Sequence, residues 1–220
     1  MSSGLIQVDT PVLSPESKRK FKTMLLFPPE WVPTAPYLAL PSLTAVLREH
    51  GHEVIQKDIN IEMYDWFFSD TFLIWVNIRM DQQRKFLKGK EQSGSGLTEQ
   101  EQSQLAYLES KADVDVMDLV DRVEHAKLVT RGEDFYDAEK LESALNVFRE
   151  VMHYISAAYY PASLVFYPME SNLGYRSGVS KEVFACLDDE QVNVYRDVCQ
   201  QLVLPAVSKE QPEVVGISIG

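Results

Sequence analysis

Three short strand-like runs, placed unevenly along the chain, constrain its fold more than any other feature of the sequence. The first two, residues 23–27 and 53–59, stand close together, whereas the third, residues 212–220, ends the sequence. The first and third runs are apolar at consecutive positions, which is typical of buried strands in a parallel sheet. We therefore expect an α/β fold.

A helical pattern joins the first two runs. It starts near Pro36 and ends at Gly51, a residue type that commonly follows the last turn of a helix. Its apolar face is expected to carry Leu40, Leu43 and Leu47. Strand, helix and strand in this order indicate a βαβ unit.

The long middle part of the chain shows helical periodicity instead. Thr98 and Glu101 have the spacing of a capping box at the start of one helix, and another helix is expected to start at Asp188. The clearest apolar stripe consists of Leu141, Leu145, Phe148, Met152 and Ile155. These patterns predict a large helical insertion between strands two and three.

The expected organisation has four parts. Residues 1–20 form a flexible arm, residues 21–62 the first βαβ part, residues 63–201 the helical insertion, and residues 202–220 the third strand. A third parallel strand normally leads into another helix that covers its flank. We therefore expect the chain to be truncated within its sheet.

Charge and composition argue against several classes of function. The chain has 21 basic and 33 acidic side chains, and this net charge of −12 disfavours nucleic acid and anionic membranes as partners. No apolar run is long enough to cross a bilayer, and residues 1–20 lack a signal-peptide core. Cys186 and Cys199, the only cysteines, are too few for a disulfide framework, so we expect a cytoplasmic location.

Two separated segments resemble the opening of a known family. Residues 23–29 read Thr-Met-Leu-Leu-Phe-Pro-Pro, and residues 36–54 contain a proline-led helix that closes with Gly-His-Glu-Val. This order resembles the amino-terminal cobalamin-binding region of cobalamin-dependent radical-SAM proteins. Residues 212–218 look like the third strand of that region, and residues 156–161 are similar to part of a helical insertion found in some of these proteins.

The resemblance implies a partial Rossmann-like, flavodoxin-like parallel sheet whose strand-end crevice holds cobalamin. The residues that it places around this crevice follow the first and third strands: Pro28, Pro29, Glu30, Trp31, Ser218 and Gly220. In this interpretation the prolines shape a stiff wall and Trp31 packs on the corrin face. The small residues Ser218 and Gly220 let the cofactor tail approach the backbone.

Departures from the family pattern limit what the chain can do. No histidine follows the first strand in an Asp-x-His-x-x-Gly arrangement, so no cobalt ligand can be named. The Cys-x-x-x-Cys-x-x-Cys triplet of an iron–sulfur cluster is also absent. We expect no catalytic residue and no metal site here. The resemblance places the 4Fe–4S cluster and S-adenosylmethionine in a further part of the parent protein, where they would serve methyl transfer or a radical rearrangement on an unknown substrate.

Simpler interpretations stay open beside this one. The proline loop is alternatively a stiff connection between strand and helix, and Trp31 an ordinary packing residue. The stripe at residues 141–155 is either a homodimer seam or a helix face against the chain's own core. For the whole chain, the main alternative is a non-enzymatic helical protein-interaction or oligomerisation module on an incomplete α/β sheet.

Overall fold

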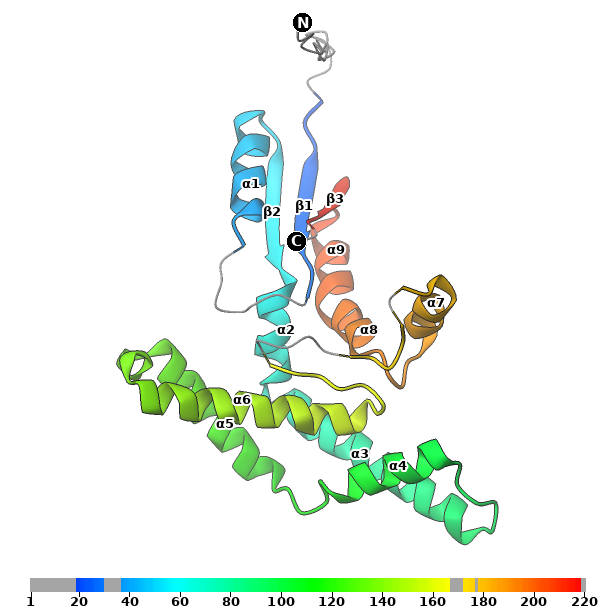
Figure 1. The fold of residues 1–220 in the computed structure, drawn as a ribbon. Coiled ribbons are helices and arrows are strands. Elements are labelled where there is room, and N and C mark those ends of the chain that lie inside the picture. Colours follow the sequence, from blue (N-terminus) through cyan, green and yellow to red (C-terminus); the bar gives the residue numbers. More distant parts are fainter. Residues whose placement is uncertain (1–18, 30–36, 167–171, 177, 219–220) are drawn as a thin grey trace, which may run out of the picture.

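The computed structural model describes residues 19–29, 37–166, 172–176 and 178–218 and shows a mixed α/β fold. A small parallel sheet stands at one end of the molecule, and helices α3 to α6 form a body at the other end (Figure 1). The α2 helix leads from the sheet into this body, while α8 and α9 lead back. The expected helical insertion between the second and third strands is therefore present.

The sheet has three strands in the order β2-β1-β3. The strands are β1 (Lys22–Phe27), β2 (Glu53–Asp58) and β3 (Val214–Ile217). Both ladders are parallel, and Thr23 of β1 lies opposite Val54 on one side and Val214 on the other. The first and last parts of the sequence thus meet in one sheet, with β1 at its centre, as the strand pattern predicted.

The two faces of the sheet are covered by different helices. On one face, Leu25, Phe27 and Val54 pack with Leu40 of α1 (Ala39–Glu49). On the other face, Met24 and Leu26 join the main core of the protein, against which residues of α9 (Leu204–Glu210) also pack. Helices on both faces bury β1 almost completely, which explains its uninterrupted apolar sequence.

The predicted buried face of α1 is wrong at one position. Leu40 and Thr44 are buried, but Leu43 is 45% exposed. The side chains that α1 turns toward β1 and β2 are Leu40, Thr44 and Leu47, at spacings of four and three residues. Leu43 lies beside this row and keeps almost half of its surface exposed.

The prediction of a buried third strand is also wrong. Val214 and Val215 are 43% exposed and Ile217 is 63% exposed. The β3 strand is an edge strand, and within the described residues no further strand pairs with its outer side. Its apolar sequence fits a central strand better than an edge, where natural sheets usually carry charged residues.

The helical body contains most of the buried apolar side chains. It is built from α2 (Ile59–Phe67), α3 (Asp70–Gln92), α4 (Glu99–Glu109), α5 (Val116–Arg131) and α6 (Ala138–Ala158), with the short turn η1 (Glu133–Tyr136) before α6. The expected capping box is present at the start of α4, where Thr98 and Glu101 bond each other's backbone N–H groups. In α6, Phe148, Met152 and Ile155 are buried, so this part of the stripe faces the chain's own core.

The segment that returns to the sheet differs from its prediction. The α7 helix (Ser180–Asp188) ends where a helix was expected to start, because Asp189 accepts hydrogen bonds from the backbone of Gln191 and Val192 in a turn. The next helix, α8 (Val194–Val198), is capped by Asn193 and continues as a π-helical turn, η2 (Cys199–Val203), into α9.

Candidate functional site

The carboxyl ends of the three strands meet at the edge of the sheet where the crevice was expected. Phe27 lies opposite Asp58 of β2, and Leu26 lies opposite Ile217 of β3. The Ser218 backbone N–H donates to the Leu26 carbonyl oxygen at 3.0 Å and so extends the ladder beyond β3. The segments that leave β1 and β3 therefore start side by side.

Tyr37 connects these two segments, and its role was not predicted from the sequence. Its ring stacks on Phe27 with 4.0 Å between ring centroids and an interplanar angle of 13°. Its Oη lies 3.2 Å from Oγ of Ser218, a hydrogen bond in which either hydroxyl can donate. The available signal was its position, since the helix that follows the first strand of a βαβ unit starts near the carboxyl edge of the sheet.

The residues predicted to line the crevice divide into two groups. Pro28, Pro29 and Ser218 lie at this edge and are half-buried. Glu30, Trp31 and Gly220 fall outside the described residues, so their predicted roles stay predictions. The structure thus brings together the described members of the set, and it adds Tyr37.

The charged side chains closest in sequence to this edge are already paired. Asp58 caps α2 by accepting a hydrogen bond from the Ile61 backbone N–H at 3.1 Å, and Lys57 bonds Glu62. Lys57 and Glu62 thus form an ion pair, whereas Asp58 has a backbone partner and no cation beside it among the described residues. Among the described residues, the edge therefore presents proline rings, one tyrosine ring, two hydroxyls and the Asp58 carboxylate.

The histidines of the sheet region lie away from this edge. His52 precedes β2, and its Nδ1 accepts a hydrogen bond from the Phe21 backbone N–H at 3.1 Å. His50 caps the end of α1, with its Nδ1 2.8 Å from the Val46 carbonyl oxygen. Among the residues described, no group of three His, Cys, Asp or Glu side chains is placed to hold a metal ion.

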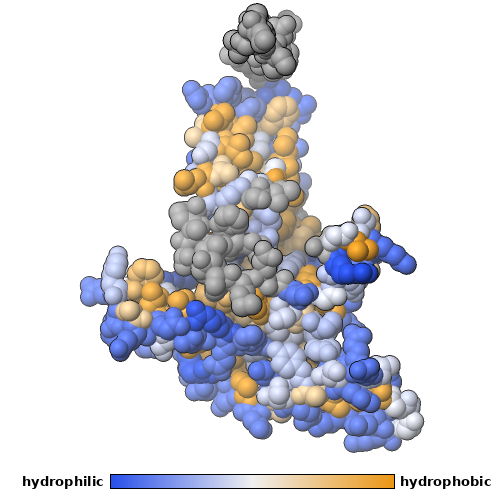
Figure 2. All heavy atoms as spheres, viewed as in Figure 1, coloured by the Kyte–Doolittle hydropathy of each residue, from blue (hydrophilic) through white to orange (hydrophobic). Residues whose placement is uncertain are grey.

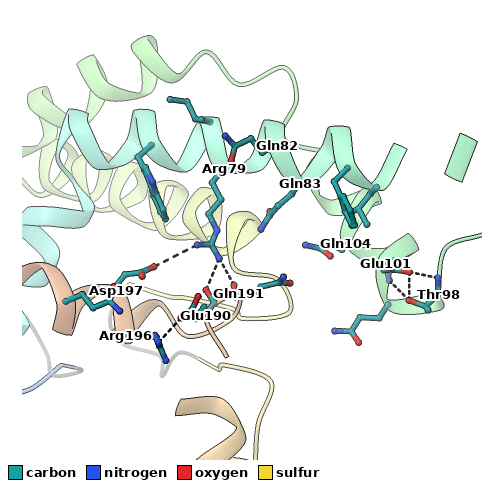
Figure 3. Close-up of a pocket in the computed structure, with 16 residues that line it drawn as sticks. Arg79, Gln82, Gln83, Thr98, Glu101, Gln104, Glu190, Gln191, Arg196 and Asp197 are labelled. Atoms are coloured by element: carbon teal, nitrogen blue, oxygen red, sulfur yellow. Dashed lines mark hydrogen bonds and ion pairs between the residues drawn. The ribbon is translucent and has the colours of Figure 1, made fainter. Parts of the chain in front are cut away.

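A second hollow lies in the helical body, well separated along the chain from the sheet edge. This groove has a volume of about 1130 Å³ and runs between α3, α4 and the segment 190–200 (Figure 3). Trp75 and Phe86 of α3, 41% and 69% exposed, are its largest apolar side chains. No local pattern in the sequence predicts this groove, because its walls come from elements far apart in the chain.

One end of this groove is fixed by a network around Arg79. The Arg79 guanidinium donates to the carbonyl oxygens of Ala158, Glu190 and Gln191 at 2.9–3.2 Å. It also lies over the Tyr159 ring, and the Tyr159 hydroxyl donates to Asp197 at 2.6 Å. Burial, and then this hydrogen bond to a carboxylate, raise the pKa of Tyr159.

The helices of the structure, like the sequence, contain no long apolar segment in the described ranges. In the described ranges, no helix is both long and apolar enough to span a bilayer. Space-filling shows a largely hydrophilic surface on this side of the helical body, with more apolar atoms around the sheet (Figure 2). Of the two free cysteines, Cys186 is buried and Cys199 is exposed.

Comparisons with known proteins do not add a relative. No model of a protein family matches the chain, and neither a curated protein nor a solved structure matches it.

Proposed function

We propose that this chain forms the first part of a Rossmann-like, flavodoxin-like cobalamin-binding domain in a radical-SAM protein. The observation that carries the proposal is the strand order β2-β1-β3 with all strands parallel. In open sheets of this kind, ligands bind beyond the carboxyl ends of the strands at the point where the strand order reverses. That point lies between β1 and β3, where Pro28, Pro29 and Ser218 are found.

The helices on the two faces support the same interpretation. The β1 strand leads into α1 on one face, whereas the helix that precedes β3, α9, lies on the opposite face. Diverging connections of this kind favour a crevice beyond the carboxyl ends of the two strands. The hydroxyls of Tyr37 and Ser218, 3.2 Å apart, would lie at the base of such a crevice.

The residues at this edge fit one wall of a cobalamin site. A corrin ring is a broad macrocycle whose rim carries amide side chains, and the half-buried proline rings with Tyr37 offer a stiff surface on which such a ring would pack. Pro28, Pro29, Tyr37 and Ser218 would hold the cofactor by packing and by hydroxyl hydrogen bonds. Both histidines of the sheet region have backbone partners elsewhere, so this wall supplies no imidazole ligand to cobalt.

The role of the chain in catalysis would be binding and shielding. When bound, cobalamin supplies the chemistry of methyl transfer or radical rearrangement, with S-adenosylmethionine and a 4Fe–4S cluster held by a further part of the parent protein. The described residues would orient the corrin at the sheet edge and keep water from one of its sides. The substrate is not defined by these residues.

Spectral titration with hydroxocobalamin tests the proposal on the full-length protein. We expect a saturable shift of the corrin absorbance. Ser218→Phe should weaken binding about tenfold or more, because the larger ring would occupy the surface beside Tyr37 at the carboxyl ends of β1 and β3. Ser208→Phe is the matched control, since Ser208 is exposed on α9 and away from the strand ends.

Two outcomes would contradict the proposal. One is a titration without any spectral shift. The other is a shift that Ser218→Phe and Ser208→Phe leave equally intact, because the cofactor would then bind somewhere else. Circular dichroism of each variant distinguishes a blocked crevice from a chain that has failed to fold.

A further inference from the structure

The groove in the helical body has dimensions that suit an elongated ligand. Its floor follows α3 from Trp75 to Phe86, a distance of about 16 Å at the helical rise of 1.5 Å per residue. Its volume of about 1130 Å³ exceeds that of most small-molecule pockets. About five residues of an extended polypeptide would span the same distance.

The apolar side chains along the floor form a stripe on one side of α3. Trp75, Ile78 and Phe86 are 41%, 50% and 69% exposed, and each lines the groove. Spacings of three and eight residues place them on one face of the helix, over a length of about three turns. An exposed stripe of this kind is typical of surfaces that bind another chain.

The charged side chains of the groove are matched within the protein. Glu101 bonds Lys90 at 2.6 Å, Glu190 bonds Arg196 at 2.7 Å, and Asp197 accepts from Tyr159. The Lys90 ammonium lowers the pKa of Glu101 to about 2, so this carboxylate stays ionised and paired. On a chain of net charge −12, the groove therefore offers no unmatched charge to a ligand.

Carboxamide side chains supply most of the remaining polarity. Six glutamines line the groove: Gln82, Gln83, Gln100, Gln104, Gln191 and Gln200. Apart from Gln83, which donates to the Ala158 carbonyl oxygen, their side-chain amides make no hydrogen bond within the described part of the chain. Each such amide can both donate and accept, which is the complement of a peptide group.

We propose that this groove binds an extended, uncharged peptide segment of a partner protein. Its apolar side chains would pack on Trp75, Ile78 and Phe86, while the glutamine amides would bond its backbone. A free peptide in extended conformation has N–H and C=O groups on both sides that need such partners. The site is distinct from the sheet edge, so the proposal does not depend on cobalamin binding.

Selection from a displayed library of random twelve-residue peptides tests this proposal with the complete chain as bait. We expect enriched sequences to be uncharged and to contain at least two apolar residues. Phe86→Glu should weaken the binding of a selected synthetic peptide about tenfold or more, since the substitution places a charge in the apolar stripe. Leu128→Glu is the matched control, because Leu128 is 71% exposed on α5 and does not line the groove.

The alternative occupants are outcomes of the same experiment. Failure to enrich any sequence, enrichment of charged peptides, or equal binding by Phe86→Glu and Leu128→Glu would each overturn the proposal. So would a dimer of the chain that Phe86→Glu dissociates, since a second copy would then fill the groove. Trp75→Phe provides an independent check: a change in tryptophan fluorescence on peptide addition should be lost in this variant while binding persists.

Discussion

The helical body and the sheet of this molecule differ in how completely they cover their apolar side chains. In the body, Phe67, Leu73, Val76 and Val151 have no exposed surface at all. In the sheet, β1 is buried but β3 leaves its apolar side chains 43–63% exposed. The helical body thus has fully buried side chains at its centre and exposed ones, such as Phe86, on its outer faces, whereas β3 has no buried side chain at all.

The largest expected loss of stability comes from a substitution in the helical body, and it tests whether this core contributes more to stability than the sheet does. Phe67 is fully buried and packs against Trp66 and Phe72. Phe67→Ala should lower the free energy of unfolding by about 3–5 kcal/mol, through lost burial and the cavity left behind. Urea denaturation followed by circular dichroism measures this change.

The matched substitution in the sheet is Ile217→Ala. Ile217 is 63% exposed, so the change should cost less than about 0.5 kcal/mol. Equal losses for Phe67→Ala and Ile217→Ala would show that β3 is covered in solution, and the contrast between the two regions would disappear.

A smaller effect sharpens the comparison inside the sheet region. Leu40 is 4% exposed and packs on the sheet, whereas Leu43 of the same helix is 45% exposed. Leu40→Ala should cost about 2 kcal/mol and Leu43→Ala well under 1 kcal/mol. Thermal unfolding of the two variants measures the difference. A larger loss of stability for Leu43→Ala than for Leu40→Ala would mean that Leu43 is buried, as the sequence predicted.

Another effect below that of Phe67→Ala concerns the hydrogen bond between Tyr159 and Asp197 in the helical body. Tyr159→Phe should cost about 1–2 kcal/mol at neutral pH, since a buried partner of Asp197 is lost. Because burial and this bond raise the pKa of Tyr159, the folded state favours the neutral phenol. The resulting stabilisation is complete below pH 10, the ordinary tyrosine pKa, and is lost as the pH rises above it.

Unfolding measured across alkaline pH checks the sign of this effect. The wild-type protein should lose stability above pH 10, and Tyr159→Phe should lose less. A residual loss is expected from Tyr154, whose pKa burial raises to about 12. An unchanged alkaline profile in Tyr159→Phe would mean that Tyr159 ionises without difficulty in the folded state.

Local patterns in the sequence predicted the elements of the fold better than their exposure. The three strands, the helix between the first two and the capping box of Thr98 and Glu101 depend on neighbouring residues, and all are present. Burial of Leu43 and of β3 was predicted wrongly, because apolar character alone does not say which neighbours exist. The turn at Asp189 replaced a predicted helix start, since an aspartate can cap a turn as readily as a helix.

The candidate sites were predictable to different degrees. The position of Pro28 and Ser218 at one edge follows from parallel pairing, which three strand-like runs are enough to suggest. The bond between Tyr37 and Ser218 requires the three-dimensional path of the chain. The groove lined by Trp75 and Phe86 depends on how segments 75–104 and 190–200 assemble, and no local pattern encodes that arrangement.

The central place of β1 has a consequence for how the protein is made. Its ladder with β2 forms between nearby segments, but the backbone N–H of Lys22 bonds the side chain of Glu213, 191 residues further along. A growing polypeptide emerges from the ribosome in order, so β1 must wait with one edge unpaired until the whole insertion has been synthesised. Early folding of the helical body would lower the entropic cost of pairing β1 with β3. It brings the two ends of a very long loop together before the sheet closes.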